Sequence, residues 1–147
     1  MYKHILIPTD GSDLAAKAIE AGVEFAREVK ARVTGFTAVP EYQIPSEVEM
    51  MARRGVSLEQ YERDAKRQAE RTLQRISDRA RAAGVEYEAD YALSDRPYEA
   101  IIRAAQKHGC DLIFMASHGR RGISALIHGS ETQDVLTHST IPTLVYR

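Results

Sequence analysis

The sequence has little cysteine, no tryptophan and almost no excess of charge. Its 147 residues include one cysteine, and 20 lysine and arginine residues stand against 21 aspartate and glutamate residues, so the net charge is −1. The lone cysteine, Cys110, can form no disulfide within the chain and supplies no thiolate cluster for a metal, which favours a reducing compartment. Nucleic-acid binders and membrane-surface binders normally carry a basic excess, so the charge argues against both classes.

Long hydrophobic runs are also missing. Leu112–Ala116 is among the longest apolar runs, far below the roughly 20 residues that span a bilayer. The first four residues lead directly into a short apolar stretch and lack the anatomy of a signal peptide. No low-complexity segment, repeat or linker divides the chain, and 44% of its residues are hydrophobic. We therefore expect one globular domain over residues 1–147, located in the cytoplasm and without a membrane partner.

Short apolar runs alternate with helical patterns along the chain. The runs predict five strands, at residues 4–8, 33–39, 85–93, 111–116 and from Ile141 to Tyr146. Small and apolar residues at spacings of three and four predict helices that begin near residues 12, 57, 97 and 130. Ser57 and Gln60 form a capping-box pattern, and Gly84 is a natural end for that helix. Prolines and a glycine punctuate residues 40–56, where no element is predicted.

The alternating order predicts an α/β fold, with an open five-stranded parallel sheet and helices on both faces. The first and fourth strands are continuously apolar, so both should lie in the centre. The third strand alternates apolar and polar residues and the fifth contains Pro142, which are marks of edge strands. The strand order 3-2-1-4-5 satisfies these constraints with right-handed crossovers. Ligands of such sheets bind where the order reverses, which here is between residues 8–12 and 116–130.

The second of these segments has features that suit phosphate. It contains two glycine turns, at Gly119 and Gly129, together with Arg120 and the start of a helix. Glycine lets backbone amides approach a ligand, and a helix N-terminus carries partial positive charge. A structural role is the alternative, because Ser130 and Gln133 also form a capping-box pattern that needs no ligand.

These residues resemble the universal stress protein family. Family members that bind ATP carry Gly-x2-Gly-x9-Gly-Ser/Thr after the fourth strand. Here nine residues separate Gly119 from Gly129-Ser130, and Ala116 stands at the position of the first glycine. The opening ILIPTDGSDLAAKAIEAG and the closing GSETQDVLTHSTIPTLVYR are also similar to the family, so the resemblance covers essentially the whole chain.

The resemblance implies an ATP-binding regulator of the stress response that takes its nucleotide with Mg²⁺ and is not a metabolic enzyme. It implies that the base and ribose lie against Pro8, Thr9, Asp10 and Ala38. The ribose and phosphates would lie along Met115, Gly119, Gly129, Ser130 and Thr132, and the same segments add Ala116, Ser117, His118, Arg120 and Glu131 to the candidate site. The Asp10 carboxylate could accept hydrogen bonds from ribose hydroxyls or the adenine amino group, or it could cap the first helix beside Ser12.

The last strand, from Ile141 to Tyr146, is apolar and lies at an expected sheet edge, which predicts a homodimer formed by two-fold pairing of these edges. Members of the family also dimerise through this strand. The alternative is a monomer whose edge is protected by Pro142 and Thr143.

Other chemistry finds little support in the sequence. P-loop, dinucleotide-fingerprint and nucleophile-elbow patterns are absent. Three histidines, His118, His128 and His138, lie ten residues apart, which is not a metal-ligand spacing, so we predict neither catalytic nor metal-binding residues. A phosphoacceptor receiver domain would need a lysine after the fifth strand, where this chain has none. The remaining alternative is the same fold acting as a dimeric interaction module that does not bind ATP.

Overall fold

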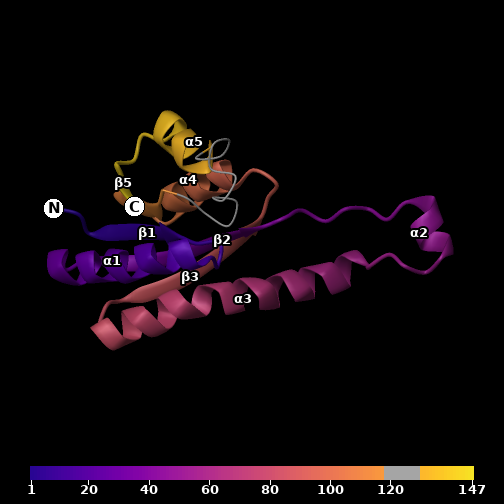
Figure 1. The fold of residues 1–147 in the computed structure, drawn as a ribbon, viewed down its shortest axis with the longest axis horizontal. Coiled ribbons are helices and arrows are strands. Elements are labelled where there is room, and N and C mark those ends of the chain that lie inside the picture. The colour runs from indigo at the N-terminus through magenta and orange to yellow at the C-terminus, as the bar shows by residue number, and fades with distance from the viewer. Residues whose placement is uncertain (118–129) are drawn as a thin grey trace.

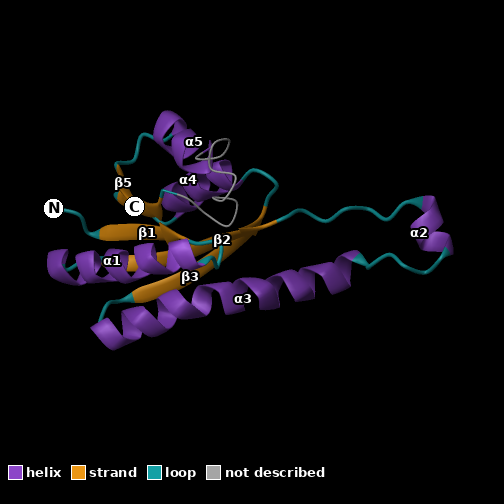
Figure 2. Cartoon of the chain, in the orientation of Figure 1, coloured by secondary structure: helices purple, strands orange, loops and turns teal. Residues whose placement is uncertain are grey.

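The computed structural model describes residues 1–117 and 130–147 and forms one five-stranded sheet (Figures 1 and 2). The elements, in chain order, are β1 (His4–Pro8), α1 (Asp13–Val29), β2 (Arg32–Val39), α2 (Glu47–Met51), α3 (Leu58–Ala83), β3 (Tyr87–Leu93), α4 (Pro97–Lys107), β4 (Leu112–Ala116), α5 (Ser130–His138) and β5 (Thr143–Tyr146). Every strand pairs in parallel with its neighbours, in the order β3-β2-β1-β4-β5. The predicted fold class and strand order are therefore confirmed.

Helices cover both faces of the sheet. Figure 1 shows α1 and α3 on one side and α4 and α5 on the other. Successive side chains of a strand point to opposite faces, so Ile5 and Ile7 pack toward α1 and α3 while Leu6 packs toward α4. All three side chains are fully buried. The sheet is thus packed between two helix layers, and the carboxyl ends of its central strands lie together at one edge of the sheet.

Serine side chains begin the two longest helices, as the sequence predicts. The Ser12 hydroxyl accepts a hydrogen bond from Ala15 N at 3.2 Å, and the Ser57 hydroxyl accepts one from Gln60 N at 3.1 Å. The capping box predicted for Ser57 is only half formed, because the Gln60 side-chain oxygen accepts a hydrogen bond from Arg63 at 2.8 Å instead of one from the Ser57 N–H. Helix α3 ends at Gly84, whose φ of 69° favours glycine.

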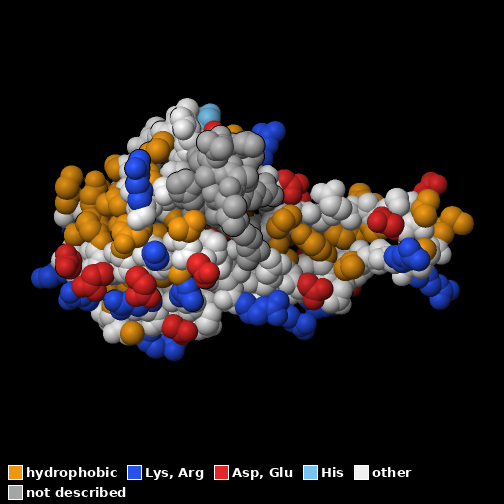
Figure 3. Space-filling view, in the orientation of Figure 1, with side chains coloured by type: hydrophobic (Ala, Val, Ile, Leu, Met, Phe, Trp, Pro, Cys, Tyr) orange, Lys and Arg blue, Asp and Glu red, His pale blue; other side chains and the backbone are white. Residues whose placement is uncertain are grey.

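An arm leaves the body of the protein between β2 and α3, where the sequence predicts no element. Figure 1 shows it as an extended segment that carries α2 far from the sheet. Helix α2 has a complete capping box between Ser46 and Glu49 but buries none of its residues. Two tyrosines brace the base of the arm: the rings of Tyr42 and Tyr61 lie 5.5 Å apart, and the Tyr42 hydroxyl donates to Val56 O at 2.6 Å. Apolar side chains lie along its surface (Figure 3).

Two strands, β3 and β5, begin two residues later than the sequence predicts. Val85 is not part of β3, because its N–H bonds to Ala80 O at 2.9 Å and closes the end of α3. Ile141 precedes β5 because its N–H turns back to the Ser139 hydroxyl at 3.0 Å. Among the described residues, no helix is long and apolar enough to cross a bilayer.

Candidate functional site

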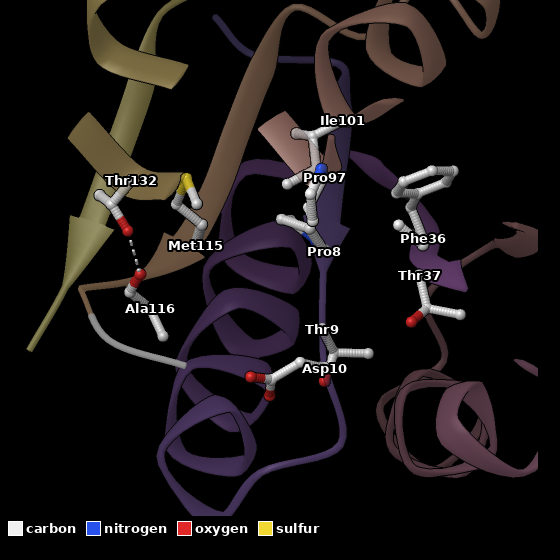
Figure 4. A pocket seen from close by; sticks show the side chains of 11 residues that line it. Pro8, Thr9, Asp10, Phe36, Thr37, Pro97, Ile101, Met115, Ala116 and Thr132 are labelled. Atoms are coloured by element: carbon white, nitrogen blue, oxygen red, sulfur yellow. Dashed lines mark hydrogen bonds between the residues drawn. The ribbon is translucent and has the colours of Figure 1, made fainter. Parts of the chain in front are cut away.

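A cleft of about 150 Å³ lies at the carboxyl ends of β1, β2 and β4 (Figure 4). This is the place where the strand order reverses between β1 and β4. The cleft is lined by Pro8, Thr9, Asp10, Phe36, Thr37, Ala38, Pro97, Ile101, Met115, Ala116 and Thr132. Seven of the predicted site residues are in this set: Pro8, Thr9, Asp10, Ala38, Met115, Ala116 and Thr132.

One part of the cleft is apolar and comes from three separate elements. Ala38 lies near the end of β2, Met115 near the end of β4, and Ile101 one turn into α4. Helix α4 begins at Pro97, which has no backbone N–H to satisfy at the first helical position and lies beside Ile101 in Figure 4. Such a slot suits a flat, weakly polar ring, because apolar walls bury its faces.

The polar part of the cleft follows β1. The Thr9 hydroxyl accepts a hydrogen bond from Gly11 N at 3.1 Å, and Asp10 Oδ1 accepts one from Ser12 N at 2.9 Å. These bonds fix the turn between β1 and α1, so Asp10 stands as a positioned carboxylate at the cleft wall. The cap of α1 is Ser12, as its bond to Ala15 shows.

Thr132 joins α5 to the end of β4. Its hydroxyl lies 3.0 Å from Ala116 O and 3.3 Å from Ser117 O, so it donates to these backbone carbonyls (Figure 4). The first turn of α5 is thereby held against the cleft. A helix N-terminus in that position carries partial positive charge, which favours an anionic group.

The other predicted site residues do not line the cleft or are not described. Glu131 Oε2 accepts a hydrogen bond from Tyr98 N at 2.8 Å, so this carboxylate caps the start of α4, where Arg96 provides no side-chain cap. Ser117 N donates to Tyr146 O at 2.8 Å and continues the ladder between β4 and β5. Ser130 is the first residue of α5. His118, Gly119, Arg120 and Gly129 lie outside the described residues.

Known proteins share this architecture. The universal stress protein family profile matches residues 1–147. The chain belongs to this family. The family protein YxiE of Bacillus subtilis is 28% identical, with both chains fully covered, and the family protein MJ0577 of Methanocaldococcus jannaschii is also 28% identical, over 100% of this chain and 96% of that protein.

Solved structures of the family superpose on the fold. The structure of MJ0577 covers 99% of this chain and 95% of its own, with a TM-score of 0.75 and 26% identity. A universal stress protein in complex with cAMP has a TM-score of 0.67 at 22% identity and covers 99% of this chain and 97% of its own. One from Archaeoglobus fulgidus in complex with dAMP has the same TM-score at 18% identity and covers 99% of this chain and 98% of its own.

Sequence reasoning missed four residues that line the cleft: Phe36, Thr37, Pro97 and Ile101. The sequence did contain a signal for two of them, Pro97 and Phe36. In a right-handed parallel crossover the helix after a strand starts at the carboxyl edge of the sheet, which is where Pro97 marks the beginning of α4. The parallel register that pairs Pro8 with Phe36 brings the second strand to the same edge.

A cluster of titratable groups lies at the amino ends of the strands, away from the cleft. His4 Nε2 lies 2.7 Å from Thr34 Oγ1, and His108 Nε2 lies 2.8 Å from Asp90 Oδ2. Burial is the main cause that lowers the pKa of His4, and burial raises the pKa of Cys110 to about 11. Cys110 is therefore a packed thiol, in agreement with its position before a buried strand. In the part of the chain that the structure describes, no group of three or more potential ligands is arranged to hold a metal.

Proposed function

We propose that the chain is an ATP-binding universal stress protein, a cytoplasmic regulator of the stress response that uses the nucleotide as a signal. The observation that carries this proposal is the cleft at the reversal between β1 and β4, where an apolar slot meets a positioned carboxylate and a helix N-terminus. Adenine, ribose and phosphate need these three environments in that order. The complexes of two family members with cAMP and dAMP support an adenine nucleotide as the ligand.

In this proposal each part of the nucleotide meets a different set of residues. The adenine ring lies among Ala38, Ile101 and Met115, whose side chains exclude water from its faces. The ribose lies next to Asp10, because a carboxylate accepts hydrogen bonds from hydroxyl groups. The phosphates extend toward Ser130 and the start of α5. Mg²⁺, when bound, would neutralise phosphate charge.

The residues that line the cleft favour binding over catalysis. Among the described residues, the lining includes one carboxylate, Asp10, and no histidine, lysine or cysteine. Asp10 already accepts a hydrogen bond from Ser12 N, which holds it in the turn. General acid–base chemistry needs a group with a suitable pKa within reach of the reacting atoms. We therefore propose a nucleotide-dependent switch with at most slow hydrolysis.

Filling the apolar slot tests this assignment. We expect Ala38→Phe to weaken ATP binding by at least about tenfold, since the added ring occupies the space that adenine needs, whereas the fold keeps its stability because Ala38 faces an open cleft. The measurement is isothermal titration calorimetry with ATP and Mg²⁺, accompanied by thermal unfolding of each variant.

Ala89→Phe is the matched control. Ala89 is exposed on the neighbouring strand β3, so the same substitution there should leave ATP affinity unchanged. If Ala38→Phe binds ATP as the parent does, adenine lies elsewhere. If the parent chain shows no binding at millimolar ATP, the protein is instead a nucleotide-free interaction module of the same fold.

We also propose that two copies pair through β5. This strand lies at the edge of the sheet, next to β4, so one side of its backbone has no strand beside it within the described chain. An exposed edge is a template for another strand, and two-fold pairing closes both edges at once. The nucleotide clefts would then lie in a dimer whose sheet is continuous.

A further inference from the structure

A second cavity, of about 290 Å³, lies on the other face of the sheet from the proposed nucleotide cleft. It is formed between the start of α1 and the middle of α3, and its lining residues are Thr9, Gly11, Ser12, Ile19, Arg71, Thr72 and Arg75. The two cavities have Thr9 in common, at the end of β1. None of the described residues that line this second cavity is a carboxylate.

A row of arginines runs along α3 past this cavity. Residues 63, 67, 71, 75 and 79 are all arginine, and a spacing of four places them on one ridge about 24 Å long. The outer members have partners: Arg79 Nε lies 2.5 Å from Glu20, Arg67 lies 4.0 Å from Asp64, and Arg63 bonds to Gln60 at 2.8 Å. Figure 3 shows basic side chains along the side of the molecule that α3 forms, with acidic side chains among them.

The two central arginines differ from the rest of the row. Arg71 and Arg75 form no ion pair and no hydrogen bond with any described residue, and both line the cavity. Carboxylates do lie near Arg75, since it also borders an adjoining groove with Glu20 and Asp78. Neither of those two carboxylates is among the residues that line the cavity.

The remaining polar side chains of the cavity are hydroxyls that can donate. Thr9 Oγ1 accepts from Gly11 N at 3.1 Å and Ser12 Oγ accepts from Ala15 N at 3.2 Å, so the hydroxyl proton of each stays available. The Thr72 hydroxyl completes the set. Two arginines and three hydroxyl-bearing residues thus line one volume, and its described lining offers donors and positive charge without an acidic side chain.

We propose that this cavity is a second anion site, separate from the nucleotide cleft, which binds the phosphoryl group of a small phosphorylated ligand. Guanidinium groups one helical turn apart match the oxygens of a phosphoryl group, which each of them can contact with two N–H donors. The volume of 290 Å³ holds such a group with room to spare, since a water molecule occupies roughly 30 Å³ in the liquid. The binding of a phosphoryl group here does not depend on ATP binding in the other cleft.

A titration of the protein with inorganic pyrophosphate tests the site. In two-dimensional ¹⁵N–¹H spectra, we expect saturable shifts of the side-chain Nε–H signals of Arg71 and Arg75 and of the backbone amides of Gly11 and Ser12. The double variant Arg71→Gln/Arg75→Gln should weaken pyrophosphate binding by at least about tenfold, because each charge-assisted contact is lost. Arg67→Gln, which removes one charge from the same ridge outside the cavity, should reduce it far less.

Two further titrations identify the source of the phosphoryl group. Adenosine carries none, so pyrophosphate should shift the same arginine signals with or without adenosine present. ATP should leave the signals of Arg71 and Arg75 unchanged if its phosphates remain on the α5 side. The proposal is overturned if pyrophosphate gives no saturable shift at millimolar concentration, if Arg67→Gln weakens binding as much as the double variant, or if ATP alone reproduces the shifts and blocks pyrophosphate. Failure of ATP to bind at all would contradict the proposed function and leave the pyrophosphate result standing.

Discussion

Replacing Gly22 with leucine is expected to lower the free energy of unfolding by about 3 kcal/mol. Gly22 is buried in α1 against the sheet, and a Cβ at this position would lie 2.9 Å from Phe114 Cδ1 and 3.0 Å from Ile7 Cδ1. Both of these side chains are buried in central strands, so neither can move without disturbing its neighbours. The measurement is urea denaturation at a fixed protein concentration, where the midpoint should fall.

Lys17→Leu is the control for this substitution, because Lys17 is an exposed residue of the same helix and a leucine there meets no packed side chain. Its midpoint should stay close to that of the parent. Gly22→Ala should lie between the two, since it adds the close Cβ without the rest of the side chain. An unchanged midpoint for Gly22→Leu would mean that α1 can move away from the sheet at little cost, contrary to the packing described above.

The second large effect concerns assembly: Val145→Pro should convert the proposed dimer into monomers. The carbonyl groups of Pro142 and Tyr146 face β4, where they accept hydrogen bonds from Ile113 N and Ser117 N, each in the range 2.8–2.9 Å. Backbone direction alternates along a strand, so the N–H of Val145 points to the open edge. Proline removes this N–H and leaves the ladder to β4 intact. Multi-angle light scattering measures the mass directly.

Val145→Ala separates the role of the backbone from that of the side chain. It keeps the N–H and should remain a dimer, with at most a modest loss of affinity. A monomeric parent protein would contradict the proposed dimer outright. If Val145→Pro keeps the full dimer mass, the two copies meet through another surface.

The strand order was predictable because a strand that is buried on both faces of the sheet differs in amino-acid composition from a strand with an exposed face. Central strands such as Leu112–Ala116 need apolar residues on both sides, whereas the sequence of the edge strand β3 alternates apolar and polar residues, and each residue of β3 is half-buried or exposed. Pro142 marked the other edge, because proline has no backbone N–H to donate and is therefore confined largely to edge strands. These are local signals with a direct physical cause, and they sufficed for the topology.

The arm and the half-formed capping box were not predictable in the same way. Residues 40–57 follow no hydrophobic period, and their path is fixed by contacts between residues far apart in sequence, such as Glu41 N with the Asp95 carboxylate at 3.0 Å. At the start of α3, the Gln60 side-chain oxygen accepts from Arg63 and not from the Ser57 N–H, and this choice depends on side-chain geometry that no spacing rule contains.

The cleft was only partly predictable from the sequence. Its β1 and β4 residues follow from the reversal of strand order, which places Thr9 and Ala116 at one edge. Ile101 fits the apolar stripe of α4 equally well whether it faces the core or a ligand, so helical spacing alone could not assign it. Glu131 caps a neighbouring helix, and that contact depends on how α4 and α5 pack.

The burial of Cys110 makes this residue a natural probe of local opening in the fold. It is the single cysteine of the sequence, 6% exposed, and its pKa near 11 leaves almost no thiolate at neutral pH. A thiol-alkylating reagent therefore reacts mainly when the core around Cys110 opens locally, since the residue is otherwise buried against its neighbours. The rate of alkylation in native buffer thus reports local opening of the fold around Cys110, without any engineered label.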